Sequence, residues 1–371
     1  QKDVIKYADA SVLYEYNDNY LMKNDFVEII KNDNKCAFCY ITGFSQGKIE
    51  ISSYLGDAYD LIGNNKLFTN FYAGGQYPIT ISTIKSKMKL KDNNLVVLNN
   101  EIERKIPLED INYIIIEDNK TIITTRLLSE ISKYFISLII CDEKYEPATI
   151  TFSYNNHYKQ LETFKVQLSS TEELKGKLWK SIVKKKIENE LVVLEMTSQD
   201  EYTIEKLKKF HSEVIDNDST NREGLAAKMY FRSVFGSEFL RFYDDGINSA
   251  LNYGYTIIKS CILRTLVKYG LNSFLGIHHK SVTNNFNLAY DLIEPYRAFV
   301  DNYLYQIQDS LTFPLSFEIR KSLIDLLNFE VVCNNMHCTI EYSIDLLVKS
   351  YIKSLEENSD LLVFPSLIND K

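Results

Sequence analysis

The sequence predicts an α+β protein in which β-rich segments come first and an all-helical region follows. Short apolar runs separated by Asn, Asp and Gly turns fill most of residues 1–165. From residue 171 to residue 356 the apolar side chains recur at helical spacing, with few Gly or Pro between them. A chain of 371 residues has room for two or three domains, each with its own core. We expect domains at 1–76, 77–165 and 166–371.

The first segment, residues 1–76, has β character. Apolar runs alternate with polar turns, which predicts strands at 25–30, 37–42 and 48–52. Cys36 and Cys39 have the spacing of half a zinc site. They lie in a predicted strand, however, where residues three apart face opposite sides, so core thiols are the better interpretation.

The second segment, residues 77–165, combines strands with one helix. Ile- and Val-rich runs bounded by Asp and Asn predict strands at 79–84, 95–98, 113–117 and 136–141. Residues 124–135 place their apolar side chains on one stripe, which predicts a helix. Residues 154–170 are polar and irregular, and we interpret them as a linker.

The third segment, residues 166–371, is predicted to be all-α. Thr171 and Glu172 form a plausible capped start. The predicted helices that follow include one at 222–235, one at 249–269 with a start near Gly246, and one at 286–294.

Composition and charge indicate which classes of protein the chain can belong to. The chain is 45% hydrophobic and 25% charged, as folded soluble proteins are. It has no run of about 18 apolar residues and no charged-then-apolar leader, so we expect a cytoplasmic protein without a membrane segment. The net charge of −8 argues against general nucleic-acid affinity, but six lysines between residues 175 and 186 create local positive charge. A solvated helix face is the alternative interpretation of those lysines.

An isolated glutamate and a pair of histidines are the first candidates for chemistry. Glu223 lies in the first turn of the predicted helix 222–235, where it could simply complement the helix dipole. The residues after it enter a core, however, and a carboxylate at the edge of a core needs a partner such as a metal. His278 and His279 follow a loop, 270–276, and either could be a surface side chain or a ligand.

A carboxylate pair supplies the remaining candidates. Asp291 and Glu294 are three apart on the predicted helix 286–294, so both project from one face. Pro295 should bend the backbone just past the pair. The alternative is an acidic solvated edge balanced by Arg297.

The candidate ligands favour a hard divalent ion. Carboxylates with one imidazole are typical of Mg²⁺ or Mn²⁺ sites and can activate a hydroxyl for attack on a phosphodiester. The sequence has no Gly-rich phosphate loop, Walker pattern or nucleophile elbow, which argues against NTP hydrolysis and acyl transfer. Asn248, Asn252 and Tyr255 share one face of their predicted helix and form a polar stripe, although core packing of the tyrosine is the alternative.

Four short segments of the sequence together resemble a known family. They are Asn221-Arg222-Glu223-Gly224, the segment 245–255, Gly276-Ile277-His278-His279 and the segment 287–297. In combination they are similar to the CRISPR adaptation integrases, the family of CRISPR-associated protein one, in its type II branch, over about residues 77–356.

The resemblance implies roles for particular residues. Glu223, His279 and Glu294 would be catalytic and would bind Mg²⁺ or Mn²⁺, with Asp291 as a further ligand or an orienting group. The residues that would contact DNA are Asn248, Asn252, Tyr255, Arg232, Arg241, Lys259, His278, Lys180 and Lys184.

The resemblance also implies a function. The expected activity is CRISPR spacer acquisition, in which protospacer 3′-OH ends are joined to the repeat by transesterification, together with endonuclease activity. Implied partners are DNA, a second copy of the chain through 77–165, CRISPR-associated protein two and the type II effector nuclease. A nuclease acting on branched or single-stranded DNA and a non-catalytic DNA-binding scaffold are the alternatives.

Residues 1–76 carry a separate, short resemblance. The words at 23–30, 40–44 and 48–51 are similar to the C-terminal PAM-reading region of compact type II RNA-guided effector nucleases. The integrase family does not normally begin with such a segment, and a natural fusion, a chimera and a gene-model join are the alternative origins.

Overall fold

The structure, a computed structural model, divides the chain into two compact units, Gln1–Gln76 and Tyr77–Lys371. Within residues 1–85 it describes the backbone of five strands. Side chains are described for residues 86–98, 103–143, 148–151, 159–197, 200–241, 243 and 245–367.

The first unit contains an antiparallel sheet. Its strands, in the order β1-β4-β3-β2, are β1 (Ile5–Asp9), β2 (Phe26–Lys31), β3 (Asn34–Ser45) and β4 (Lys48–Ser53). The three strands predicted from the sequence in this segment are present, and β1 was not predicted. Cys36 and Cys39 lie on β3, but their side chains fall outside the described residues.

The second unit begins with two sheets and a helix. One sheet has the order β10-β6-β7-β8 and the other β12-β11-β9-β5, with β9 parallel to both of its neighbours. The elements are β5 (Tyr77–Ile81), β6 (Lys87–Lys91), β7 (Asn94–Asn99), β8 (Ile102–Pro107), β9 (Ile111–Ile116), β10 (Ile122–Ile123), α2 (Thr125–Lys133), β11 (Ser137–Cys141) and β12 (Pro147–Thr151).

Strand β9 is buried on both faces, which explains its unbroken apolar sequence. Alternate residues of a strand face opposite sides. Tyr113 and Ile115 pack into the core shared with the helices, whereas Ile114 and Ile116 pack with Leu127 of α2.

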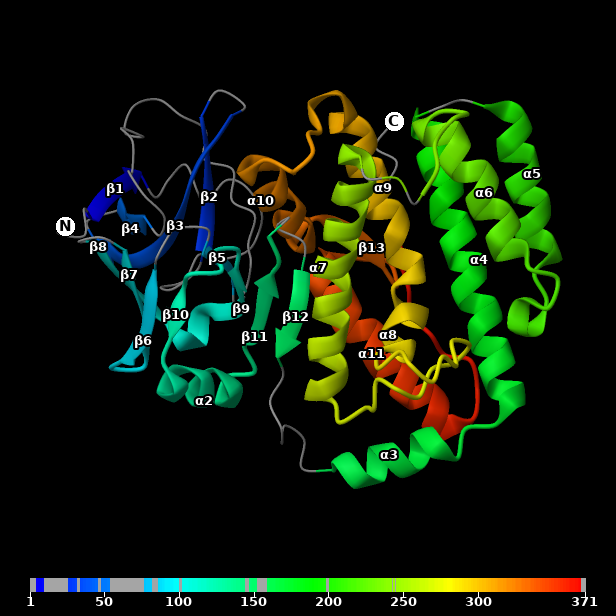
Figure 1. The fold of residues 1–371 in the computed structure, drawn as a ribbon, viewed down its shortest axis with the longest axis horizontal. Helices are drawn as coiled ribbons and strands as arrows, with labels where there is room; N and C mark the ends of the chain where they lie inside the picture. Colours follow the sequence, from blue (N-terminus) through cyan, green and yellow to red (C-terminus); the bar gives the residue numbers. More distant parts are fainter. Residues whose placement is uncertain are drawn as a thin grey trace. The chain divides into compact units, whose positions relative to one another are not determined.

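Helices dominate the rest of the second unit (Figure 1). They are α3 (Gln160–Leu168), α4 (Glu172–Thr197), α5 (Glu201–Glu213), α6 (Arg222–Phe235), α7 (Gly246–Lys268), α8 (Asn287–Leu292), α9 (Arg297–Ile307), α10 (Phe317–Asp325) and α11 (Ile340–Glu357). The predicted α+β class, with β-rich segments before a mostly helical region, is confirmed. Among the described residues, no helix is both long and apolar enough to cross a membrane.

Two details of the sequence interpretation were wrong. Residues 154–170 are not irregular throughout, because 160–168 form α3. The buried side chain of Gln167 holds this helix in place by donating to the Asn272 carbonyl at 2.8 Å and accepting from the Asn272 amide at 2.9 Å. The segment 171–356 is also not helical throughout, since β13 (Glu330–Cys333) and β14 (Met336–Thr339) form a hairpin that pairs with β15 (Pro365–Ser366).

A buried ion pair joins the sheet region to the helices. Arg320 of α10 donates to the Glu117 carboxylate at 2.6 and 3.0 Å, and both side chains are buried. A bidentate pair of this kind fixes orientation as well as distance. Removing one partner would leave a buried charge uncompensated, which is strongly destabilising.

Candidate active site

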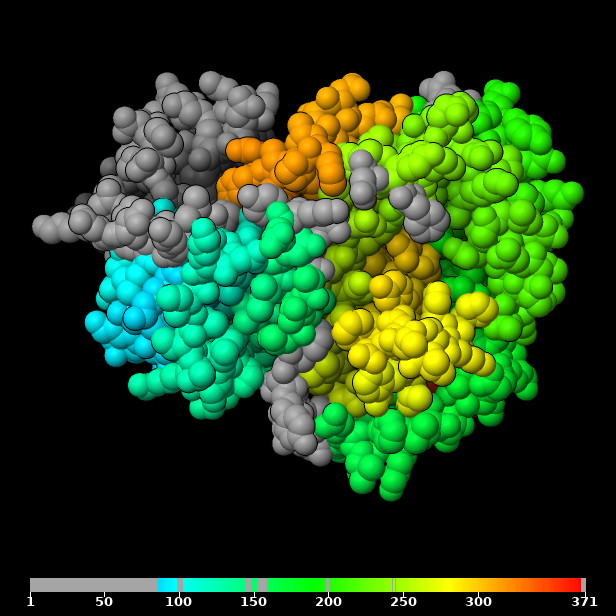
Figure 2. Space-filling view, viewed as in Figure 1, coloured from blue at the N-terminus to red at the C-terminus, as the bar shows by residue number. Residues whose placement is uncertain are grey.

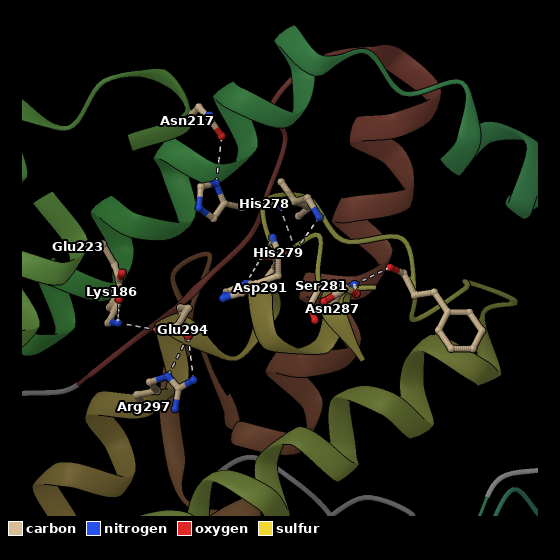
Figure 3. Close-up of polar contacts among 12 residues, drawn as sticks. Lys186, Asn217, Glu223, His278, His279, Ser281, Asn287, Asp291, Glu294 and Arg297 are labelled. Atoms are coloured by element: carbon tan, nitrogen blue, oxygen red, sulfur yellow. Dashed lines mark hydrogen bonds and ion pairs between the residues drawn. The ribbon is translucent and has the colours of Figure 1, made fainter. Parts of the chain in front are cut away.

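Four segments from distant parts of the sequence meet at one place in the helical region. They are the middle of α4, the start of α6, the loop before α8, and the turn that follows α8 (Figure 3). Figure 2 shows the loop before α8 (yellow) at the surface of the molecule.

Glu223 is positioned by the first turn of α6. The Asp218 carboxylate accepts hydrogen bonds from the backbone amides of Arg222 and Glu223, each at 2.9 Å. These contacts satisfy amides that have no partner within the helix. The Glu223 carboxylate then points toward α4, where it accepts a hydrogen bond from the Lys186 ammonium.

Glu294 reaches the same ammonium from a different element. The predicted helix 286–294 is shorter than expected, since α8 ends at Leu292 and Glu294 begins the 3₁₀ turn Glu294–Tyr296. One carboxylate oxygen of Glu294 accepts from Lys186 at 2.6 Å and the other from Arg297 at 2.9 Å. Asp291 and Glu294 therefore turn to different partners. Both are buried, so the alternative of a solvated acidic edge is wrong, although the contact with Arg297 is present.

The pKa values of this pair follow from burial and charge. Burial is the largest single influence on Glu294 and favours the neutral acid, but the charges and hydrogen bonds of Arg297 and Lys186 together lower its pKa to about 2. Burial likewise disfavours the charged form of Lys186, and the carboxylates of Glu294 and Glu223 nonetheless raise its pKa above the ordinary value. A full positive charge thus lies between two carboxylates.

Asp291 organises the loop that carries the histidines. Its fully buried carboxylate accepts from the backbone amides of Ile277, His278 and His279 at 2.5, 3.2 and 3.0 Å. It also lies 2.7 Å from His279 Nδ1. A proton on Nδ1 leaves Nε2 of His279 as the lone-pair nitrogen, which is how metal-binding histidines are commonly oriented. The hydrogen bond to Asp291 raises the pKa of His279 against the opposing effect of burial.

Gly276 leaves space for this arrangement. A Cβ atom at Gly276 would lie 2.8 Å from Asp291 Oδ2 and 3.0 Å from the Asn287 Cβ, besides meeting the His279 carbonyl oxygen. Any side chain here would push the carboxylate away from the loop.

Trp179, the single tryptophan of the chain, lies against both histidines. The His278 ring stacks on the Trp179 ring with centroids 4.3 Å apart, and His279 meets the Trp179 edge at 5.8 Å. His278 Nδ1 lies 3.0 Å from Asn217 Oδ1 (Figure 3). Burial lowers the pKa of His278, so the two adjacent histidines differ in their preferred charge.

Glu190 lies one helical turn beyond Lys186 on α4 and is almost completely buried. Its Oε2 atom has no hydrogen-bond partner within the described part of the chain. Burial, despite the nearby Lys186 charge, raises the pKa of Glu190 to about 8. Sequence reasoning missed Glu190, Trp179 and Lys186; the lysine was grouped with a run that includes exposed side chains.

Several residues expected to contact DNA cluster around Arg241. Its guanidinium donates to Asn248 Oδ1 at 3.0 Å and to Asn252 Oδ1 at 2.9 Å, and lies 5.4 Å from the Tyr255 ring centroid. Asn252 is exposed, whereas Asn248 and Tyr255 are buried and the Tyr255 hydroxyl donates to Asp301. The predicted polar stripe is therefore partly an internal network.

The remaining DNA-contact candidates lie on other elements. Lys259 donates to the Tyr290 hydroxyl at 3.2 Å, and Lys180 pairs with Asp216 at 2.9 Å. Arg232 is exposed and Lys184 is half-buried. Their roles stay predictions.

The donor set suits a divalent cation, although no metal geometry is already formed. Among the described residues, no three His, Cys, Asp or Glu side chains are grouped as a ready metal site. The positively charged Lys186 ammonium lies between the Glu223 and Glu294 carboxylates and donates to both (Figure 3). Two carboxylates that already hold one cation, beside an imidazole with an oriented Nε2, fit a hard metal ion.

Paired carboxylates, an oriented histidine and basic side chains on a helical scaffold fit an enzyme that acts on phosphodiesters. Comparison with known families identifies which one. The family described as CRISPR associated protein Cas1 matches residues 79–326, and the chain belongs to this family. The family resemblance found in the sequence is confirmed.

One relative supports this assignment by sequence, and two solved structures share the fold. The CRISPR-associated endonuclease Cas1 of Neisseria meningitidis serogroup C (strain 8013) is 36% identical over 286 residues, covering 76% of this chain and 93% of the relative. A casposase bound to integration product shares the fold with a TM-score of 0.63 at 20% identity, covering 78% of this chain and 92% of that one. A chain of a Cas6-RT-Cas1–Cas2 complex gives 0.65 at 19% identity, covering 80% and 37%.

Proposed function

We propose that this chain is the integrase of CRISPR spacer acquisition in a type II system. It joins the 3′-OH ends of a captured protospacer to the repeat by transesterification and has endonuclease activity. The observation that carries the proposal is the convergence of Glu223 and Glu294 on one positive charge, beside His279, in a chain of the Cas1 family.

Glu223, Glu294 and the Nε2 atom of His279 would hold Mg²⁺ or Mn²⁺. Such an ion polarises a phosphodiester and lowers the pKa of a bound hydroxyl group. Asp291 serves chiefly to orient His279, since its carboxylate already accepts from three backbone amides and the ring nitrogen. The alternative is that Asp291 also contacts the ion directly.

Basic and polar side chains around the site would bind the DNA backbone. Lys180, Lys184, Arg232 and Lys259 would contact phosphates, with Arg241 and Asn252 at one edge. Asn248 and Tyr255 would act through Arg241 because their polar groups bond internally. His278, stacked on Trp179, would contact DNA next to the ligand His279.

The proposed partners are DNA, a second copy of the chain, CRISPR-associated protein two and the effector nuclease. The casposase whose fold this chain shares is bound to an integration product, and the chain that matches in the Cas6-RT-Cas1–Cas2 complex is assembled with Cas2. We propose that residues 77–165 form the dimerisation domain and 166–371 the catalytic domain.

Strand transfer tests the proposal. A short labelled duplex is incubated with a repeat-bearing plasmid, with and without Mn²⁺, and the joined product is measured. We expect joining by the natural chain with Mn²⁺ and loss of about a hundredfold or more in Glu223→Gln and His279→Ala, as for removal of a metal ligand. His337→Ala, which removes an exposed histidine of β14, should retain activity.

The products distinguish the alternatives. Cleavage of branched or single-stranded DNA without joining would favour the structure-specific nuclease. Tight DNA binding with neither joining nor cleavage would favour the scaffold and would overturn the proposal.

A further inference from the structure

Lys186 is held in the position that the proposed metal ion would need. Its side chain is only 6% exposed, and its ammonium contacts Glu223 and Glu294 together. Glu294 keeps Arg297 on its other oxygen, so loss of the Lys186 contact would leave that carboxylate still paired. Of the two cationic side chains, Lys186 contacts both proposed metal ligands, whereas Arg297 contacts Glu294.

A second position for the ammonium exists on the same helix. Glu190 is four residues after Lys186, and side chains at this spacing are neighbours on a helix surface. Its Oε2 atom is buried without a hydrogen-bond partner in the described residues. A buried polar atom without a hydrogen bond destabilises the folded protein, and a hydrogen-bond donor that reaches it removes this penalty.

Resting on the proposed function, we propose that Lys186 is a built-in counter-ion that the divalent metal displaces, and that Glu190 receives the displaced ammonium. In the metal-free protein, Lys186 holds the Glu223 and Glu294 carboxylates close together. When the ion binds them, the Lys186 side chain turns along α4 and donates to Glu190. Lys186 and Glu190 are positioning residues, because neither contacts the ion or the substrate.

The two variants should act in opposite directions. Lys186→Met removes the competing cation, which frees Glu223 and one oxygen of Glu294 while Arg297 keeps the other, so the ion binds more tightly. Glu190 can give up its proton to the solvent when the ammonium arrives and so become its carboxylate partner. Glu190→Gln cannot ionise, so displacement is harder and the ion binds more weakly. A lysine with only a structural role would not produce this opposition.

The test is a titration of the full chain with MnCl₂ at pH 7.5, followed by the fluorescence of Trp179. This single tryptophan lies 5.8 Å from His279 between ring centroids, so it reports an ion at the site without any measurement of activity. We expect the Mn²⁺ Kd to fall roughly tenfold in Lys186→Met and to rise roughly tenfold in Glu190→Gln, about one charge contact in each case.

Lys185→Met is the matched control. Lys185 is the adjacent lysine and is also buried, but it pairs with Glu188 and Ser366. Its removal should leave the Kd within about twofold, below the effect of one charge contact. Should Lys186→Met fail to fold, Glu190→Gln still decides, because it removes no contact to Glu223 or Glu294 and should fold.

The outcomes separate the inference from the function on which it rests. An unchanged Kd in Glu190→Gln, or weaker binding in Lys186→Met, would overturn the counter-ion exchange while metal binding stands. An unchanged Kd in Glu223→Gln would instead contradict the proposed metal site itself.

Discussion

At the scale of single residues, Asp291 has the most consequential set of contacts. One carboxylate holds three loop amides and the His279 ring, so the loop shape and the orientation of this proposed ligand depend on the same side chain. Orienting carboxylates of this kind act on a metal through the histidine they hold.

Asp291→Asn should therefore weaken Mn²⁺ binding. The amide group of Asn presents N–H groups where Asp291 now accepts, so two or more donors lose their partner. We expect Mn²⁺ affinity to fall by about 10–100-fold and the thermal midpoint to drop, as expected for unpaired buried donors. Trp179 fluorescence and thermal unfolding measure the two effects.

The control for this change is Asp309→Asn, which alters an exposed carboxylate in the turn after α9. Both observables should stay at their natural values there. Natural Mn²⁺ affinity in Asp291→Asn would show that His279 needs no orienting partner.

The site residues that were predictable from sequence are those whose signal is local. Glu223 and the pair Asp291 and Glu294 belong to short sequence motifs. A helix start, or two carboxylates three residues apart, can be recognised within one helical turn. Lys186 meets Glu223 and Glu294 across separations of 37 and 108 residues. No local pattern encodes such a contact, and this is why the lysine was grouped with its sequence neighbours.

At the scale of elements, α4 supports most of the site. Its 26 residues carry Trp179, Lys186 and Glu190. Asn189 on the same helix donates to the Pro295 and Pro365 carbonyls at 2.8 and 3.1 Å, which ties α4 to the turn of Glu294. A shift of α4 would thus move the tryptophan, the counter-ion and the Glu294 turn together.

Helix α4 also shows where sequence patterns lose information. The boundaries of α6 agree with the predicted 222–235, because one face is apolar and the start is marked by polar residues. In α4, apolar and charged side chains alike are buried, among them Lys185, Lys186 and Glu190. Charged residues lie on the exposed face of α4 as well, Lys177, Glu188 and Glu195 among them, so charge alone gave no sign of which side chains are buried.

The pKa of Glu190 predicts a pH dependence of stability. Its folded-state pKa of about 8 is above the ordinary 4.5, so the folded protein binds this proton more tightly than the unfolded chain. The associated stability is fully present below about pH 4.5 and is lost as pH rises through about 8. In Glu190→Gln the group cannot ionise, so that loss should disappear.

We therefore expect Glu190→Gln to gain stability relative to the natural chain between pH 5 and 8, by at most about 1.4 kcal/mol per pH unit. Urea unfolding in EDTA at a series of pH values measures the difference. Glu188→Gln, an exposed neighbour on α4, should show no such trend. Parallel curves for Glu190→Gln and the natural chain would mean that Glu190 ionises normally in the fold.

At the scale of the whole molecule, the charge distribution is uneven. The net charge is −8, yet basic side chains are available near the site on α4 and α6. Phosphate binding depends on local potential, because each neutralised phosphate releases condensed counter-ions.

Replacing Lys180, Lys184 and Arg232 by Gln should reduce the salt dependence of DNA binding. Each lost phosphate contact should lower the slope of log affinity against log salt by about 0.9 on a duplex. Fluorescence anisotropy with a labelled duplex at several NaCl concentrations gives the slope. The charge-matched control replaces Lys133, Lys349 and Lys353, which are exposed on α2 and α11. Equal slopes in both triple variants would place the DNA path elsewhere.

The division of the chain into two units leads to a prediction about residues 1–76. The Cas1 family match begins at residue 79, and residues 1–76 form a compact unit of their own with a local antiparallel sheet. The short resemblance to an effector nuclease suggests a different origin for this unit. We propose that it is dispensable for integration.

Deleting residues 1–76 should leave strand transfer within about twofold of the full chain and leave the unfolding transition of the remainder intact. The physical reason is that β5, the first strand of the second unit, pairs with β9 in a sheet whose other strands all come from residues after 76. Hydrophobic burial in that unit does not require residues before Tyr77 if the two units fold separately. Thermal unfolding and the strand-transfer assay are measured together, since loss of both would make residues 1–76 part of the integrase fold, whereas loss of transfer alone would give them a role in DNA or partner binding.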